Sequence, residues 1–164
     1  MSADNNSLAV GLGEIKTSRN ANDVLVAYGL GSCVGVGVYD PQVKVAGLLH
    51  AVLPERLNGT EPASPKYVDS GLMGLISQVE KEGADRRRLI VWLTGGANML
   101  TAPGFKQTLN IGERNVVAAL AGLATLNLKI RAQEVGGHVG RTVRLYVSNG
   151  RFTMRALGSQ ERDL

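Results

Sequence analysis

The single cysteine and one of the two histidines suggest the most direct chemistry in this sequence. Cys33 follows the glycine-rich stretch YGLGS, and His50 lies within the apolar run AGLLHAVLP. A thiolate is a strong nucleophile, and a neighbouring imidazole lowers the pKa of the thiol or takes its proton. Backbone N–H groups of a bend around Gly31 and Ser32 could form an oxyanion hole. Together these groups would suit acyl transfer or amide hydrolysis.

The two residues come together if the chain between them forms a β-hairpin. Valines at every second position predict extended segments over 23–32 and 32–40, and the apolar run 45–54 predicts the returning strand. With Pro41 and Gln42 as the two loop residues, Cys33 lies directly opposite His50. The prediction depends on register, because a slip of one residue turns His50 to the other face. Proline does not suit a two-residue turn, so a longer or bulged loop is the alternative.

Both residues also have a structural interpretation. A lone cysteine at the start of a strand is usually an inert buried side chain, and a histidine in an apolar run is usually a hydrogen-bonded core residue. His138 is expected in a loop. The acidic residues that lie apart, without a recognisable carboxylate pair or metal motif, are Asp40, Asp69, Glu113 and Glu134. The local pattern therefore leaves the catalytic and structural readings of Cys33 open.

Two helices and further strands are expected around the hairpin. Ser64 and Pro65 predict the N-cap and first residue of a helix that ends before Gly83. A second helix is expected within 110–129, with Asn110 as its cap and Val116, Leu120, Leu123 and Leu126 on its apolar face.

Strands are expected at 89–93 and 129–137, and Asn149-Gly150 predicts a type I′ hairpin. Gly35 and Gly37 leave one strand face bare, which often admits another backbone or a ligand, although close packing against a helix is the commoner explanation. The order of elements predicts a mixed α/β fold with largely antiparallel strands.

Length and composition favour one domain over residues 1–164, with flexible tails at about 1–8 and 159–164. One cysteine cannot form an internal disulfide, and the first residues lack the pattern of a signal peptide. The chain has no apolar run of about 18 residues that could span a bilayer. We therefore expect a cytoplasmic protein without direct membrane insertion.

The net charge is +4, but the only basic cluster, 85–89, resembles a solvated loop, so no nucleic-acid partner is expected.

Six motifs follow one another over nearly the whole chain: GLGSCVGVGVYDP, AGLLHAVLP, PKYVDSGL, GGANM, NIGERN and EVGGHVGRTV. In this order they resemble the motifs of the CheD family of chemoreceptor glutamine deamidases. The resemblance implies an α/β sandwich similar to that of Cys-His toxin deamidases. It also implies hydrolysis of glutamine side-chain amides on the cytoplasmic helices of chemotaxis receptors, with Cys33 as nucleophile and His50 as acid and base. Receptor methyl esters are a further substrate that the resemblance implies, and no metal or organic cofactor is expected.

One position departs from the family pattern. The family usually has a threonine six residues before the cysteine, as a third catalytic member, and Ala27 stands there in this chain. An alanine cannot orient an imidazole by a hydrogen bond, so Tyr28, Ser32 or a main-chain carbonyl would have to do so. The family also implies a CheC-type phosphatase as a partner. The alternatives to a deamidase are a catalytically weakened binding module for such a phosphatase or a receptor, and a redox protein that uses Cys33.

Overall fold

The computed structural model describes residues 5–56, 61–99 and 110–164. In this part of the chain, ten strands form two five-stranded sheets. Sheet A has the order β1-β3-β8-β9-β10, and sheet B has the order β2-β5-β4-β6-β7. The elements are β1 Asn6–Ala9, β2 Glu14–Ser18, β3 Asp23–Leu30, β4 Val34–Asp40, β5 Val45–Ala51, α1 Val68–Lys81, the short 3-10 helix Arg86–Arg88, β6 Ile90–Gly95, α2 Ile111–Thr125, β7 Ile130–Val135, β8 Arg141–Tyr146, β9 Phe152–Ala156 and β10 Arg162–Asp163.

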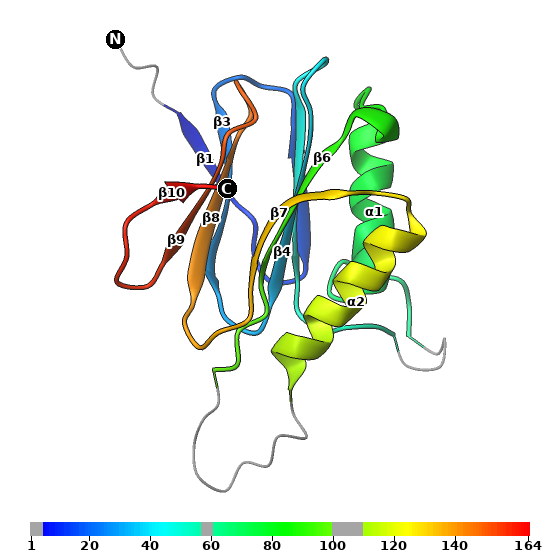
Figure 1. Cartoon of the computed structure of the whole chain (residues 1–164). Helices are drawn as coiled ribbons and strands as arrows, with labels where there is room; N and C mark the ends of the chain where they lie inside the picture. Colours follow the sequence, from blue (N-terminus) through cyan, green and yellow to red (C-terminus); the bar gives the residue numbers. More distant parts are fainter. Residues whose placement is uncertain (1–4, 57–60, 100–109) are drawn as a thin grey trace, which may run out of the picture.

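The two sheets pack face to face, and α1 and α2 cover the outer face of sheet B (Figure 1). Only the pairs β1–β3 and β6–β7 are parallel among the described strands. The predicted mixed α/β fold with largely antiparallel strands and two main helices is therefore confirmed. None of the described helices covers the outer face of sheet A in Figure 1.

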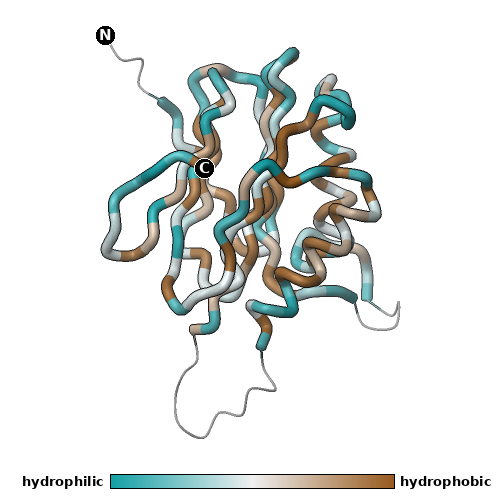
Figure 2. Tube along the Cα trace, in the orientation of Figure 1, coloured by the Kyte–Doolittle hydropathy of each residue, from teal (hydrophilic) through white to brown (hydrophobic). Residues whose placement is uncertain are grey.

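Apolar side chains fill two layers, one on each face of sheet B. Figure 2 shows the apolar residues concentrated in the central strands and along the helices, with hydrophilic segments toward the outer loops. In β4, alternate residues face opposite layers, since Val36 and Val38 pack toward the helices while Tyr39 packs between the sheets. This alternation assigns Cys33, which packs against the layer between the sheets, to the same side as Tyr39.

The two glycines of β4 are explained by the second sheet. A Cβ atom on Gly37 would lie 2.6 Å from Phe152 Cε2, and one on Gly35 would lie 2.9 Å from Leu30 Cδ1. Both neighbours belong to sheet A. The expected packing of a helix against this face is therefore wrong, because the side chains of Leu30 in β3 and Phe152 in β9 occupy the space beside the two glycines.

The hairpin of β4 and β5 has a longer loop than the two-residue turn. Asp40 pairs with Val45, so the loop contains four residues, 41–44, and Lys44 has a positive φ of 55°. In this register His50 pairs with Gly35, and the prediction that His50 directly opposes Cys33 is wrong. The physical reason lies in Pro41, whose fixed φ does not fit a two-residue hairpin turn. The register differs by two residues, so His50 keeps the expected face.

The Asp40 side chain fixes the start of this loop. Its carboxylate accepts hydrogen bonds from the N–H groups of Gln42 and Asp85 at 3.0 Å and 2.8 Å, and it pairs with Arg88 at 2.7 Å. Burial raises the pKa of Asp40, but the Arg88 side chain and the two N–H groups outweigh burial and lower it. Arg88 therefore neutralises a buried carboxylate, so this part of the basic cluster at 85–89 is structural rather than simply solvated.

Several predicted details of the other elements also differ. Helix α1 begins at Val68 after Tyr67 as N-cap, rather than at Ser64 and Pro65. Ser64 instead stabilises the preceding turn, where its hydroxyl accepts from the Lys66 N–H at 3.1 Å. Gly83 has the positive φ expected just past the end of α1.

Paired strands lie near both chain ends, and the last hairpin differs from the prediction. The segments expected as tails, about 1–8 and 159–164, include residues of β1, which pairs with β3, and of β10, which pairs with β9. The loop between β8 and β9 contains four residues, 147–150, because the Tyr146 N–H donates to the Arg151 carbonyl at 2.9 Å. The predicted type I′ turn is wrong, because only Gly150 of the Asn149-Gly150 pair has a positive φ. None of the described helices is long and apolar enough to cross a membrane.

Candidate active site

The bend that carries Cys33 is held in place by three consecutive carbonyl groups. The Gly31 carbonyl accepts from the Ala97 N–H at 2.8 Å, and the Cys33 carbonyl accepts from the Gly96 N–H at 2.8 Å. Between them, the Ser32 carbonyl accepts from the Asn115 side chain at 2.9 Å. The donors come from the end of β6 and from α2. The bend is therefore fixed through its main chain, and its side chains need not take part.

Glycines allow these segments to approach one another. Gly95 and Gly96 have φ values of +95° and +67°, which favour glycine, and a Cβ atom on Gly95 would overlap the Cys33 carbonyl oxygen. Gly112 in α2 lies directly under this turn, where an added Cβ atom would lie 2.7 Å from the Gly96 carbonyl oxygen. The glycines of the GGANM and NIGERN motifs are thus required by the close contact of β6, α2 and the cysteine bend.

Asn115 links the cysteine bend to the strand that bears the histidine. Its side-chain amide donates to the Ser32 carbonyl at 2.9 Å and to the Val52 carbonyl at 2.9 Å. The residue is fully buried on the inner face of α2, with Ala119 and Leu123 one and two turns further along. Val52 directly follows β5, which carries His50. One amide group therefore sets the spacing between the two candidate catalytic segments.

The predicted apolar face of α2 missed this residue. The buried side of the helix consists of Gly112, Asn115, Ala119 and Leu123, whereas Leu120, which was expected inside, is 39% exposed. The signal in the sequence that could have identified Asn115 was its position four residues before Ala119 and eight before Leu123, which places all three on one face of the helix. The predicted cap Asn110 does precede α2, but its side chain makes no capping hydrogen bond.

Cys33 is a partly buried thiol at the end of the layer between the sheets. Burial raises its pKa, and a hydrogen bond from its own backbone N–H to the sulfur partly offsets this by lowering the pKa. At rest the thiol is therefore protonated at neutral pH, and it needs a base to become a nucleophile.

His50 is buried, with 3% of its surface exposed, and only one of its ring nitrogens has a hydrogen-bond partner among the described residues. Nδ1 lies 2.9 Å from the Val10 carbonyl oxygen. A carbonyl only accepts, so Nδ1 carries the proton and Nε2 is left with a free lone pair. Burial lowers the pKa of His50, whereas the Val10 carbonyl and the charge of Glu14 raise it, and the net change is downward. The imidazole is thus neutral and oriented, as a general base must be.

Ala27 lies beside the group that orients His50. Ala9 pairs with Val26 in the parallel pair β1–β3, and the Val10 N–H continues this pairing with a bond to the Val26 carbonyl at 2.7 Å. Ala27 is the next residue of β3, fully buried and directed into the layer between the sheets. Of the groups considered for orienting the imidazole, a main-chain carbonyl is the one found in contact with it. Sequence reasoning did not identify Val10, because nothing in its side chain indicates the role.

The remaining candidate residues lie elsewhere. His138 lies in the loop between β7 and β8, as expected, where Nδ1 contacts the Asn98 carbonyl at 3.0 Å. Glu134 pairs with Arg162, and Asp69 lies 3.8 Å from Arg56. Within residues 5–56, 61–99 and 110–164, no cluster of three or more His, Cys, Asp or Glu side chains is placed to hold a metal ion.

The fold and this site define a two-sheet α/β protein with a buried, oriented histidine and a thiol on the same face of one sheet. The model of the family described as "CheD chemotactic sensory transduction" matches residues 52–156. The chain belongs to the CheD family.

Individual relatives match over nearly their whole length. A Symbiobacterium thermophilum protein named "Probable chemoreceptor glutamine deamidase CheD" is 41% identical over 158 residues, which cover 95% of this chain and 96% of that protein. A Pyrococcus horikoshii protein with the same name is 43% identical over 147 residues, covering 89% and 90%. Among solved structures, YlmD from Geobacillus stearothermophilus matches with a TM-score of 0.46 and 10% identity, covering 76% of this chain and 50% of that one. This TM-score and identity are too low to support an inference about the function of this chain.

Replacing Asn115 with alanine is expected to loosen the link between the two candidate segments. Two buried carbonyls, those of Ser32 and Val52, would lose their donor, so the free energy of unfolding should fall by roughly 1–3 kcal/mol. The loosened bend should also admit reagents, and iodoacetamide should alkylate Cys33 faster than in the wild type. Urea denaturation and mass spectrometry measure the two effects. Met73→Ala on the exposed side of α1 is the control, and an unchanged stability in Asn115→Ala would contradict the role.

Proposed function

We propose that this protein is a cysteine-dependent protein-glutamine deamidase that acts on chemotaxis receptors from the cytoplasm. The observation that carries the proposal is the state of His50, whose Nδ1 is held by the Val10 carbonyl while the buried Nε2 has no partner among the described residues. Burying an imidazole nitrogen without a partner costs free energy, which is typical of a site that is completed by a substrate or by a proton transfer. The names of the curated relatives supply the substrate class.

The first half of the reaction forms a thioester. Nε2 of His50 takes the thiol proton of Cys33, and the sulfur attacks the carbonyl carbon of the glutamine side chain. The tetrahedral intermediate carries its negative charge on the former carbonyl oxygen. The protonated His50 then gives its proton to the nitrogen, so the carbon–nitrogen bond breaks and ammonia leaves.

The second half hydrolyses the thioester. His50 is neutral again after ammonia leaves, and it takes a proton from a water molecule that attacks the thioester carbon. The carbon–sulfur bond breaks, the thiolate recovers the proton, and the product is a glutamate side chain. The same route would accept a glutamate methyl ester, with methanol in place of ammonia as the leaving group.

The oxyanion would be stabilised by the cysteine bend. Backbone N–H groups near Ser32 and Cys33 would donate to the negative oxygen of the tetrahedral intermediate. The carbonyls of Gly31, Ser32 and Cys33 are all engaged by donors behind the bend, which keeps them from turning toward the negative oxygen. We assign Gly31 and Ser32 the role of shaping this oxyanion site.

Val10 takes the place of the orienting side chain that the family usually has at the position of Ala27. A main-chain carbonyl and a hydroxyl oxygen both accept a hydrogen bond from Nδ1–H, and either one leaves Nε2 as the base. This supports an active enzyme over a binding module whose catalysis has been weakened by Ala27.

The deamidase is tested with the purified cytoplasmic fragment of a chemoreceptor from the same organism. Mass spectrometry should show conversion of glutamine to glutamate, a gain of about one mass unit per site, and release of ammonia. Cys33→Ala and His50→Ala should each lower the rate by about 10³-fold or more, because both halves of the reaction need both groups. Tight binding of the fragment by the wild type without any conversion would overturn the enzyme and favour a binding module or a regulator of a CheC-type phosphatase.

Restoring a threonine at position 27 is expected to bring no gain in activity. Ala27 is fully buried in a packed layer, so Ala27→Thr adds atoms where there is little space and should cost roughly 1–3 kcal/mol of stability. The Nδ1 atom already has its acceptor in Val10. Ala27→Ser is the matched control that adds a hydroxyl with less volume. A rise of tenfold or more in kcat for either variant would contradict the role of the Val10 carbonyl.

The acidic limb of the pH profile reports the pKa of His50. The base must be neutral, and burial keeps its pKa below the ordinary value of 6.5, so kcat/KM should fall only at pH values below 6.5. Glu14 raises this pKa, so Glu14→Gln should move the limb to lower pH. Glu80→Gln on α1 is a matched removal of charge far from the site and should leave the limb in place. A limb that moves upward in Glu14→Gln would contradict the assignment.

A further inference from the structure

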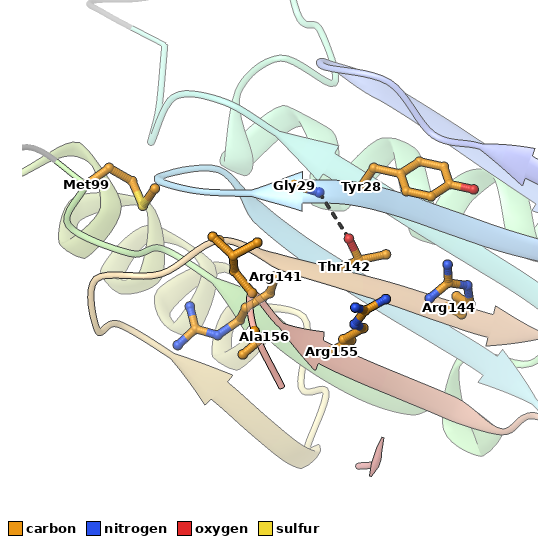
Figure 3. A pocket seen from close by; sticks show the side chains of 11 residues that line it. Tyr28, Gly29, Met99, Arg141, Thr142, Arg144, Arg155 and Ala156 are labelled. Atoms are coloured by element: carbon orange, nitrogen blue, oxygen red, sulfur yellow. Dashed lines mark hydrogen bonds between the residues drawn. The ribbon is translucent and has the colours of Figure 1, made fainter. Parts of the chain in front are cut away.

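A groove of about 510 Å³ lies on the outer face of sheet A, away from the helices (Figure 3). Strands β3, β8 and β9 form it, and the loop after β6 closes one end through Met99. Neither Cys33 nor His50 lines this groove. It is thus separate from the catalytic pair, and the proposed reaction leaves it without a role.

Two arginines give the groove a positive charge that the described residues do not neutralise. Arg144 and Arg155 project from β8 and β9, and neither forms an ion pair within the described part of the chain. Arg144 lies over the ring of Tyr28 at 5.9 Å, and Arg155 donates to the Ser159 carbonyl at 3.1 Å. A third arginine, Arg141, is buried and donates to the Gly136 and Gly95 carbonyls, so it belongs to the framework.

Exposed apolar side chains surround this charge. Tyr28 is 53% exposed, Met99 is 50% exposed and Leu157 is 79% exposed. Large apolar side chains at such exposure, next to unpaired arginines, are typical of protein-binding surfaces, where tyrosine and arginine are enriched. The groove therefore combines exposed apolar side chains (Tyr28, Met99 and Leu157) with the positive charges of Arg144 and Arg155.

One end of the groove reaches the cysteine bend. Met99 packs against Gly31, since a Cβ atom on Gly31 would lie 3.2 Å from Met99 Cγ. The Gly31–Cys33 bend begins directly after Leu30, which pairs with Arg141 at the same end of sheet A. A polypeptide segment that lies along the groove toward Met99 would therefore end beside the bend that carries the nucleophile.

We propose that this groove, defined by Tyr28, Met99, Arg144, Arg155 and Leu157, docks a carboxylate-bearing segment of the receptor next to the glutamine that is deamidated. The inference rests on the proposed function. Each turnover converts a neutral amide into a carboxylate, so a modified receptor segment carries negative charge. Arg144 and Arg155 are placed to bind such carboxylates, and their attraction for the segment must weaken as salt increases.

The test compares charge reversals in and outside the groove. Arg144→Glu, Arg155→Glu and the double variant are assayed on the purified receptor cytoplasmic fragment, with Arg131→Glu on β7 as the matched control. Arg131 is likewise an exposed strand arginine without an ion pair in the described part of the chain. The KM of the double variant should rise about tenfold or more while kcat stays within about twofold, because docking and chemistry are separate. Leu157→Ala should raise KM without changing its salt dependence.

Two further measurements keep this inference distinct from the proposed function. The dissociation constant of the fragment is measured in the Cys33→Ala background at several salt concentrations, so it reports docking even if the wild type converts no glutamine. The rate of Cys33 alkylation by iodoacetamide shows that the variants keep an intact bend. The inference is overturned if affinity and KM are unchanged in the double variant, or if Arg131→Glu weakens binding as much as the groove variants do.

Discussion

The hydrogen bond from His50 Nδ1 to the Val10 carbonyl is the interaction on which the proposed site depends. It sets the tautomer of a buried imidazole, and with it the availability of Nε2 as a base. The bond exists only because β1 lies parallel to β3, which brings Val10 next to Val26, and because β2 pairs with β5 beside His50. The N-terminal strands β1 and β2 therefore belong to the proposed site as much as the hairpin that carries His50.

The proposed nucleophile, Cys33, is positioned in a similar way. The main-chain N–H groups of Ala97 and Gly96 and the side-chain amide of Asn115 donate to the three carbonyls of the bend. The site is also partly desolvated, so both the thiol and the imidazole are neutral at rest. In the proposed reaction, transfer of the thiol proton to His50 would form the thiolate only during attack on the glutamine, which would avoid a reactive thiolate in the free protein.

The sequence predicted side-chain periodicity well and turn geometry poorly. Alternation of valine in β4, with the apolar run 45–54 as the returning strand, placed Cys33 and His50 on one face, because the period of a strand survives a register change of two residues. The direct opposition of the pair failed because Pro41 does not fit a two-residue turn, and the four-residue loop 41–44 takes its place, with Asp40 at its start held by Arg88 and Asp85. Asn115 and Val10 were missed because their roles arise from tertiary contacts of an amide and a main-chain carbonyl.

Ala27 then has a physical interpretation that the sequence alone did not supply. A side-chain acceptor at this position would have to share the fully buried space beside Val10, where the main-chain carbonyl already accepts from Nδ1. A main-chain acceptor is present whatever side chain occupies position 10, so orientation of His50 depends on the path of the chain between β1 and β2. Substitutions that move the main chain between β1 and β2, rather than those at position 27, would therefore remove the acceptor of Nδ1 and with it the orientation of His50 as the proposed base.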